Sequence, residues 1–213
     1  MTLADKVTSI RLIFAPIFFA VYFLPRFFPS IFAIPPAPSG WYLNFTGAAW
    51  TVPILIILFT GAQLTDLFDG KIARKQKEVS DFGKLYDPFA DTLAQVTFFL
   101  CFVIEGILPP LLFLVMLYRE FSILFLRNLM LKKGVAMQAR MGGKAKTVTY
   151  IVAGSLSLLA ASFYRVGVGG EIYRWCIIAA VTVFAIAVVI AVISFFDYVS
   201  VYRRTSAGGS PNI

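Results

Sequence analysis

The sequence predicts an all-α membrane protein with six transmembrane helices, and two observations lead to this fold class. Of the 213 residues, 59% are hydrophobic and only 14% are charged, and the mean hydropathy is +0.82. A soluble domain of this length carries more charge. Six apolar stretches are also long enough to span a bilayer or nearly so. They are residues 9–28, 48–68, 83–106, 109–131, 147–163 and 174–201.

Local signals support these spans in order along the chain. Before residue 9 the sequence is mixed polar and apolar, which leaves room for a short interfacial helix at the N-terminus. Residues 29–41 are rich in proline and glycine and predict a loop after the first span. Ser80 or Asp81 can cap the third span. No repeat or second domain is apparent, so we expect one membrane domain over residues 1–205 and a disordered tail over residues 206–213.

The basic residues predict how the spans are oriented. Most of the 19 lysines and arginines lie at the N-terminus, between spans two and three, between spans four and five, and after span six. The opposite side has Arg26, Arg165 and Arg174. Cytoplasmic loops of membrane proteins carry the excess of lysine and arginine. We therefore expect both termini in the cytoplasm, together with the loop between spans two and three.

Residue types narrow the chemistry that this chain can perform. It contains no histidine, which excludes a histidine general base, a phosphohistidine and a histidine-ligated metal. Acid–base chemistry therefore falls to carboxylates. The two cysteines, Cys101 and Cys176, lie within predicted spans, where buried packing is the ordinary role of a free thiol.

Eight residues between positions 66 and 91 form a regular pattern, D-x2-D-G-x2-A-R-x8-G-x3-D-x3-D. On a helix, Asp66 and Asp69 project from one face, and residues 83, 87 and 91 share a face of the next helix. Two such helices side by side bring four carboxylates together, which repel one another unless cations neutralise them. Mg2+ or Mn2+, which prefer oxygen ligands, are the natural occupants. The plain alternative is a solvated loop in which these aspartates pair with nearby lysines.

The pattern resembles the signature of the CDP-alcohol phosphotransferases, also called CDP-alcohol phosphatidyltransferases, and matches it at all eight positions. Members of that family move a phosphoalcohol or phosphatidyl group from a CDP-linked donor to an acceptor hydroxyl. The resemblance implies two divalent cations held by Asp66, Asp69 and Asp87, with Asp91 either a further ligand or the base that deprotonates the acceptor. It also implies a homodimer. The residues that it assigns to the CDP-linked donor are Asp69, Gly70, Ala73, Arg74 and Gly83.

The glycines and the arginine of this pattern have ordinary roles as well as functional ones. Gly70 and Gly83 lack a Cβ, so they let a nucleotide approach the helix backbone, although close helix packing is the common role of a transmembrane glycine. Arg74 can fork onto phosphate oxygens or anchor the cytoplasmic end of its span. The N-terminal segment also resembles the family's opening, with Ser9 and Arg11 near its polar positions.

A second group of charged residues predicts where the acceptor binds. Span four contains Arg119, Glu120 and Arg127 in an apolar helix, and ionisable residues at that depth usually face a cavity or a partner. Arg140, Lys144 and Lys146 follow in the next loop, where attraction to anionic lipids is the alternative reading.

These segments are similar to the R-E-x6-R and G-K-x-K-T segments of one branch of the family, the phosphatidylglycerophosphate synthases. That branch usually has lysine directly after the last aspartate, where this chain has Thr92. The resemblance implies transfer of the phosphatidyl group of CDP-diacylglycerol to glycerol 3-phosphate, in a multi-pass protein of the bacterial inner membrane. Because a dianionic acceptor suits a cationic pocket, we expect it to contact Arg119, Arg127, Arg140, Lys144 and Lys146.

Two other functions compete with this one. The first keeps the chemistry and replaces the acceptor by inositol phosphate, inositol or serine. The second is a cation transporter, because acids inside a membrane often mark ion paths. The acids of this chain cluster at the cytoplasmic ends of spans two and three, with none in span five and only Asp197 in span six. A conduction path would continue across the bilayer, so we favour the enzyme.

Overall fold

The fold comes from a computed structural model that describes residues 3–28, 48–76, 81–132 and 141–206. Side chains are described for residues 8–28, 48–65, 83, 86–132 and 145–203. Over these ranges the chain is helical and contains no strand, which confirms the predicted all-α class. The helices are α1 (Leu3–Phe27), α2 (Thr51–Gln76), α3 (Asp81–Ile104), α4 (Pro110–Lys132), α5 (Met141–Val166) and α6 (Glu171–Ser206).

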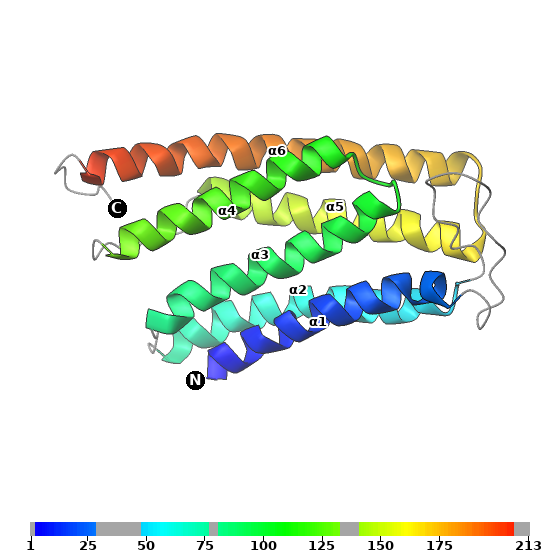
Figure 1. The fold of residues 1–213 in the computed structure, drawn as a ribbon, viewed down its shortest axis with the longest axis horizontal. Helices are drawn as coiled ribbons and strands as arrows, with labels where there is room; N and C mark the ends of the chain where they lie inside the picture. Colours follow the sequence, from blue (N-terminus) through cyan, green and yellow to red (C-terminus); the bar gives the residue numbers. More distant parts are fainter. Residues whose placement is uncertain (1–2, 29–47, 77–80, 133–140, 207–213) are drawn as a thin grey trace.

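The helices lie lengthwise beside one another, so that the molecule has two distinct ends (Figure 1). One end gathers the starts of α1, α3 and α5 and the last turns of α2, α4 and α6. We call it the motif end, because the aspartate pattern lies there. The opposite end contains the short turn between α3 and α4 and the turn between α5 and α6.

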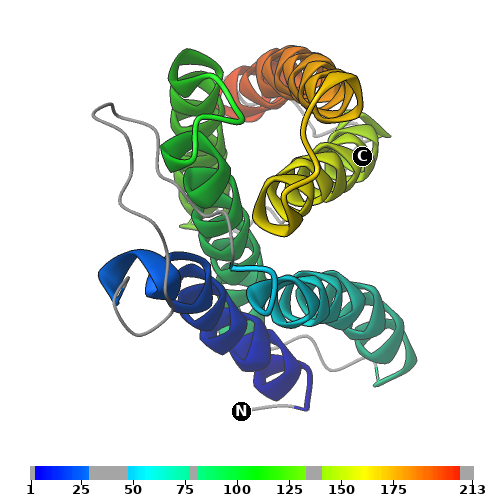
Figure 2. The ribbon, with the colours of Figure 1, turned by 90° about the vertical axis from the view of Figure 1, so that its right-hand side faces the viewer.

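The helices pack as two groups of three. α1 packs against α2 and α3, whereas α6 packs against α4 and α5. α3 joins the groups through its contacts with α4 and α5, and Figure 2 shows α1 and α2 on one side of the molecule and α4, α5 and α6 on the other.

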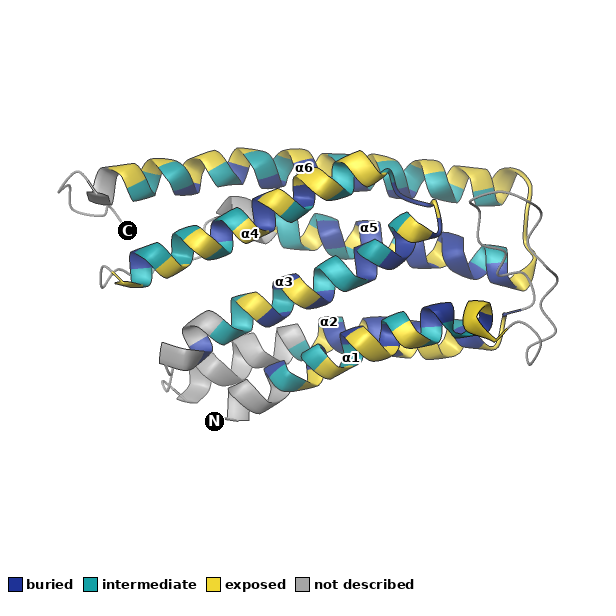
Figure 3. Ribbon diagram, viewed as in Figure 1, coloured by how far each residue is buried: buried dark blue, intermediate teal, exposed yellow. Residues whose placement is uncertain are grey.

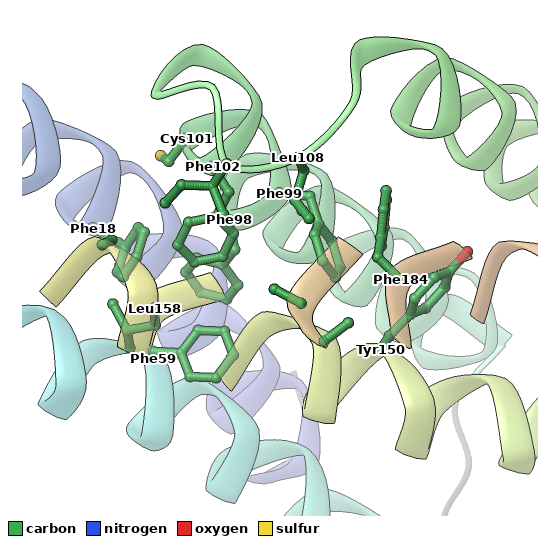
Figure 4. Close-up of a cluster of buried hydrophobic side chains, with 14 of the residues drawn as sticks. Phe18, Phe59, Phe98, Phe99, Cys101, Phe102, Leu108, Tyr150, Leu158 and Phe184 are labelled. Carbon is green, nitrogen blue, oxygen red and sulfur yellow. The ribbon is translucent and has the colours of Figure 1, made fainter. Parts of the chain in front are cut away.

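Aromatic side chains fill the space between these groups (Figure 4). Phe98 of α3 lies 4.8 Å from Phe18 of α1 and 5.3 Å from Phe59 of α2, measured between ring centroids. Its neighbour Phe99 lies 4.7 Å from Phe184 of α6. Aromatic pairs of this kind contribute about 0.5–1.5 kcal/mol beyond the area that they bury. The core therefore fixes the position of α3 between the two groups, and α3 also contains Asp87 and Asp91.

Gly154 allows α5 to approach this aromatic core. A Cβ at that position would meet Cζ of Phe59 at 2.8 Å, closer than real Cβ contacts. Small residues at helix interfaces have this role in membranes, where packing rather than exclusion of water holds helices together.

The outer surface of the bundle is apolar. Leu111 and Ile57 are 71% and 68% exposed, and exposed residues follow the outward faces of α1, α4 and α6 (Figure 3). Soluble proteins rarely expose continuous apolar surface of this extent. Within the described residues, four segments are long and apolar enough to cross a bilayer: Thr8–Phe27, Tyr86–Ile104, Ala145–Val166 and Glu171–Arg203. The chain therefore has the character of a membrane protein.

Two of the six predicted spans, α2 and α4, are not among these four segments. α4 is interrupted by three charged residues, Arg119, Glu120 and Arg127. The described apolar part of α2, Thr51–Thr65, is shorter than the other spans. α1 is continuous from Leu3, so the polar residues before residue 9 begin α1 rather than a separate interfacial helix. α5 starts at Met141 and α6 extends to Ser206. The remainder of the predicted tail, residues 207–213, lies outside the described residues.

A buried charged cluster joins three helices near the end opposite the motif. Arg165 of α5 donates from Nη1 to both carboxylate oxygens of Glu105, at 3.0 and 3.1 Å. Tyr22 of α1 donates its hydroxyl to the same carboxylate, and the Arg165 guanidinium lies 4.2 Å from the centroid of the Tyr22 ring. All three residues are buried. Among the described side chains, one acid thus meets one base here, and with Tyr22 this pair links α1 and α5 to the residue that follows α3.

Candidate active site

The aspartate pattern spans the last turns of α2 and the first turns of α3, both at the motif end (Figure 1). Because α2 is helical through Gln76, Asp66 and Asp69 have the predicted i, i+3 relation, and Gly83, Asp87 and Asp91 have theirs on α3. Side chains of residues 66–76 lie outside the description. The convergence of all four carboxylates therefore stays a prediction, as do the contacts of Gly70, Ala73 and Arg74.

Helix α1 supplies partners to two aspartates of α3, Asp87 and Asp91. Thr8 donates its hydroxyl to Oδ1 of Asp87 at 2.8 Å, and Arg11 forms an ion pair with Asp91. Thr8 and Arg11 are both buried. They lie three residues apart on α1 and so share a face, as Asp87 and Asp91 do on α3. These contacts orient both carboxylates, and Arg11 compensates the charge of one of them.

Sequence reasoning identified this support only in part. It singled out Ser9 and Arg11, whereas the structure pairs Thr8 with Asp87 and brings the Ser9 hydroxyl to 3.0 Å from the Tyr86 hydroxyl. The overlooked signal was spacing, because Thr8 and Arg11 stand one helical turn apart.

A polar cavity of about 260 Å³ opens beside Asp91. It is smaller than the pockets of about 300–1,000 Å³ that hold drug-sized ligands, so its size suits a small polar molecule. Residues from both helix groups line it. Its charged or polar lining includes Arg11, Gln63, Asp91, Thr92, Gln95, Arg119, Glu120, Arg127, Lys146 and Tyr198.

One wall of the cavity is a network of two cations around Glu120. Lys146 of α5 donates to both carboxylate oxygens of Glu120, at 2.8 and 2.9 Å. Arg119 donates from Nη1 to Oε1 of Glu120 at 2.9 Å, and from Nε to the carbonyl oxygen of Ala191 on α6 at 3.0 Å. Arg119 and Glu120 are buried. The network thereby joins α4, α5 and α6 at the cavity.

Arg127 is the third cation on this wall, and its surroundings differ. Its guanidinium lies 5.8 Å from the centroid of the Tyr198 ring, in a cation–π contact. Among the described side chains, no acid pairs with Arg127. Among the described side chains, this wall thus has three cations, Arg119, Arg127 and Lys146, and one carboxylate, Glu120, which leaves an excess of positive charge.

The structure thus brings four predicted site residues to one cavity, namely Asp91, Arg119, Arg127 and Lys146. Lys144 lies in the first turn of α5 with its side chain outside the description, and Arg140 lies outside the described residues altogether. Sequence reasoning missed Tyr198 and gave Glu120 no role. Asp87 and Asp91 offer carboxylate oxygens one helical turn apart, and such oxygens are the ligand atoms that a divalent cation prefers. Within the described side chains, no cluster of three acids occurs.

Comparison with known proteins shows which family this chain is similar to. A family model described as CDP-alcohol phosphatidyltransferase matches residues 1–193. A Treponema pallidum protein named CDP-diacylglycerol--glycerol-3-phosphate 3-phosphatidyltransferase is 36% identical over 203 residues, which cover 95% of this chain and 89% of the relative. A Bacillus subtilis protein of the same name is 34% identical over 74% of this chain and 76% of its own length.

A Mycobacterium tuberculosis relative, named probable phosphatidylglycerophosphate synthase, is 30% identical over 97% of this chain and 84% of its own length. The resemblance inferred from the aspartate pattern is thus confirmed over nearly the whole chain. This chain belongs to the CDP-alcohol phosphatidyltransferase family.

Proposed function

We propose that this protein transfers the phosphatidyl group of CDP-diacylglycerol to glycerol 3-phosphate, giving phosphatidylglycerophosphate and CMP. The observation that supports this most is the shared cavity, whose lining includes Asp91 together with the cations Arg119, Arg127 and Lys146. The names of the relatives from Treponema pallidum and Bacillus subtilis agree with the same donor and acceptor.

In this reaction the acceptor hydroxyl oxygen forms a bond to the phosphorus of the phosphatidyl group. The bond from that phosphorus to the oxygen of CMP breaks, and CMP leaves with the electron pair. We assign the proton of the acceptor hydroxyl to a carboxylate oxygen of Asp91. Its ion pair with Arg11 holds this carboxylate in a set orientation at the cavity, as a general base requires.

The donor side of the site belongs to the aspartate pattern. We assign Asp66, Asp69 and Asp87, with Asp91, to hold two divalent cations, Mg2+ or Mn2+, which would neutralise charge on the pyrophosphate and on departing CMP. Thr8 supports Asp87 from outside that ligand set. The donor nucleotide would meet Asp69, Gly70, Ala73, Arg74 and Gly83.

The acceptor side belongs to the cationic wall. Arg119, Arg127 and Lys146, with Lys144 and Arg140 from the segment before α5, would offset the two negative charges of glycerol 3-phosphate. Inositol and serine lack a phosphate and leave the positive excess uncompensated. Inositol phosphate has a phosphate as well, and the names of the relatives favour glycerol 3-phosphate over it. A cation path finds no support here, because the charged wall of the cavity is mainly positive.

For the arrangement in the membrane, we propose that all six helices cross the bilayer with both termini and the motif end in the cytoplasm, and that residues 1–205 form one domain. The positive-inside distribution supports this orientation. In α4, Arg119 and Glu120 are buried toward α5 and α6 rather than toward lipid, which lets that helix span despite its charges. The homodimer rests on the family resemblance.

The decisive experiment supplies the purified protein with CDP-diacylglycerol and Mg2+ and then adds glycerol 3-phosphate, inositol phosphate, inositol or serine in separate reactions. We expect CMP release with glycerol 3-phosphate well above the other acceptors. Preference for any other acceptor would overturn the assignment.

A further inference from the structure

Glu120 is an acid on the wall of a cavity that is otherwise suited to an anion, and it has no part in the chemistry proposed above. Both of its oxygens receive hydrogen bonds from cations: Lys146 from α5 and Arg119 from its own helix. Coulomb's law alone makes a carboxylate unfavourable beside a bound phosphate. A carboxylate at this position therefore needs a role that offsets its repulsion of a bound phosphate.

We propose that Glu120 is the positioning residue of the acceptor pocket: it holds Arg119 and Lys146 in the places from which they meet the phosphate of the acceptor. This inference rests on the proposed function, since it takes the acceptor to be a phosphorylated alcohol. Glu120 itself does not touch the acceptor in this arrangement, because both of its oxygens face the two cations.

The geometry supports positioning in two ways. Lys146 has a flexible four-carbon side chain whose ammonium lies on both oxygens of Glu120, at 2.8 and 2.9 Å, and this contact removes freedom that the free side chain has. Arg119 is fixed at a second point, because its Nε donates to the Ala191 carbonyl oxygen of α6. Glu120 therefore couples a mobile cation on α5 to a fixed one that joins α4 to α6.

Charge counting supports the same role. Without Glu120, three cations would share one buried wall, and mutual repulsion would drive Lys146 toward solvent. With Glu120 the wall still has a positive excess, because Arg127 has no acid partner among the described side chains. The pocket thus keeps charge for a phosphate while its cations stay close together.

The test is Glu120→Gln, which preserves shape. Lysine and arginine only donate hydrogen bonds. Because Lys146 donates to both oxygens of Glu120, the NH2 group of a glutamine faces Lys146 in either orientation of the amide and removes an acceptor from it. We expect the Kd for glycerol 3-phosphate, measured by calorimetric titration, to rise at least about tenfold, the lower range for a lost charge-assisted hydrogen bond. The KM for CDP-diacylglycerol should change less than about twofold. Glu120→Asp should fall between the two proteins.

Glu105→Gln is the matched control, because Glu105 is also a buried acid that pairs with an arginine but lies away from the cavity. It should lower the unfolding temperature with little change in the Kd for glycerol 3-phosphate. A purely structural role for Glu120 predicts that both variants behave alike, which would overturn the inference. So would unchanged or tighter binding of glycerol 3-phosphate by Glu120→Gln, the result that Coulomb repulsion alone predicts.

A double-mutant cycle makes the test independent of folding yield. In a Lys146→Gln background, Glu120→Gln should raise the Kd for glycerol 3-phosphate much less than it does in the parent, because the lysine that Glu120 positions is absent. Additive effects would overturn the positioning role. A parent protein that binds glycerol 3-phosphate but does not transfer to it would refute the proposed function and leave this binding readout intact. A parent that binds none would refute both.

Discussion

Glu105 follows the last turn of α3 and Glu120 lies midway along α4. Both acids are buried, and their surroundings differ in one respect that matters. Each meets an arginine, and each cluster joins three helices. Among the described side chains around Glu105, one acid meets one base, and Tyr22 also donates to the acid. Around Glu120 two cations share the acid, and a third, Arg127, lines the same cavity, as Asp91 does.

The difference separates a structural ion pair from a binding site. A buried pair with matched charges is satisfied by itself, and its loss costs stability. A wall with surplus positive charge is satisfied only when an anion arrives, so selection for stability alone would not retain it. The excess of charge, together with the cavity, distinguishes the surroundings of Glu120 from those of Glu105. Five predictions test this distinction, from the largest expected effect to the smallest.

The largest effect should come from Asp66→Asn and Asp69→Asn at the motif end. Each removes a proposed metal ligand, so activity should fall by orders of magnitude while the unfolding temperature in detergent stays near that of the parent. CMP release in the presence of EDTA should likewise vanish and return with added Mg2+. Full turnover in EDTA would contradict the metal assignment.

Asp91→Asn and Asp87→Asn should separate base chemistry from metal binding. If Asp91 acts chiefly as the base, its variant should bind CDP-diacylglycerol nearly as the parent does and lose turnover. The Asp87 variant should lose both, because the proposed metal ligands include Asp87. Binding is measured with CDP-diacylglycerol in nanodiscs and turnover by CMP release. Normal turnover by Asp91→Asn with an unshifted pH profile would place the base elsewhere.

Glu105→Ala should have the opposite profile, with large loss of stability and little loss of chemistry. It leaves Arg165 buried without its acid, which costs about 3–5 kcal/mol. Thermal unfolding measures the loss, and activity per folded molecule should stay near that of the parent. The double variant Glu105→Ala/Arg165→Met should recover part of the stability. If Glu105→Ala raised the KM for glycerol 3-phosphate without lowering stability, the structural role of Glu105 would be contradicted.

Arg127→Ala should act on the acceptor alone. Loss of a charge-assisted hydrogen bond is worth about 1.5–3 kcal/mol, so the KM for glycerol 3-phosphate should rise roughly 10- to 150-fold. The KM for CDP-diacylglycerol should change far less. Arg174→Ala is the control, because Arg174 is an exposed arginine that pairs with Glu171 at the opposite end. Equal shifts in both KM values would remove Arg127 from the acceptor pocket.

Tyr198→Leu should have the smallest effect. It removes the ring beside the Arg127 guanidinium, and a cation–π contact of about 0.5–1 kcal/mol corresponds to a roughly two- to fivefold rise in the KM for glycerol 3-phosphate. Tyr198→Phe keeps the ring and should match the parent. If both variants lose equally, the hydroxyl rather than the ring supports the pocket.

Much of this protein could be predicted without its structure. The helical class, the aspartate pattern and the charged residues of α4 depend on composition and on spacing within one helix, which are local properties. Boundaries were less accurate: the predicted start of the fifth span lies six residues after Met141, the first residue of α5. Polar residues at membrane interfaces continue a helix without adding hydropathy, so hydropathy alone places that boundary late.

The sequence by itself determined which groups are present and at which end of the bundle they gather. Only the tertiary structure decided which of them meet: Thr8 with Asp87 across 79 residues, Arg119 with Ala191 across 72, and Lys146 with Glu120 across 26. These pairings depend on how each helix is rotated about its axis against its neighbours. That rotation follows from packing around residues such as Phe98 and Gly154, and packing between distant segments has no signature in local spacing.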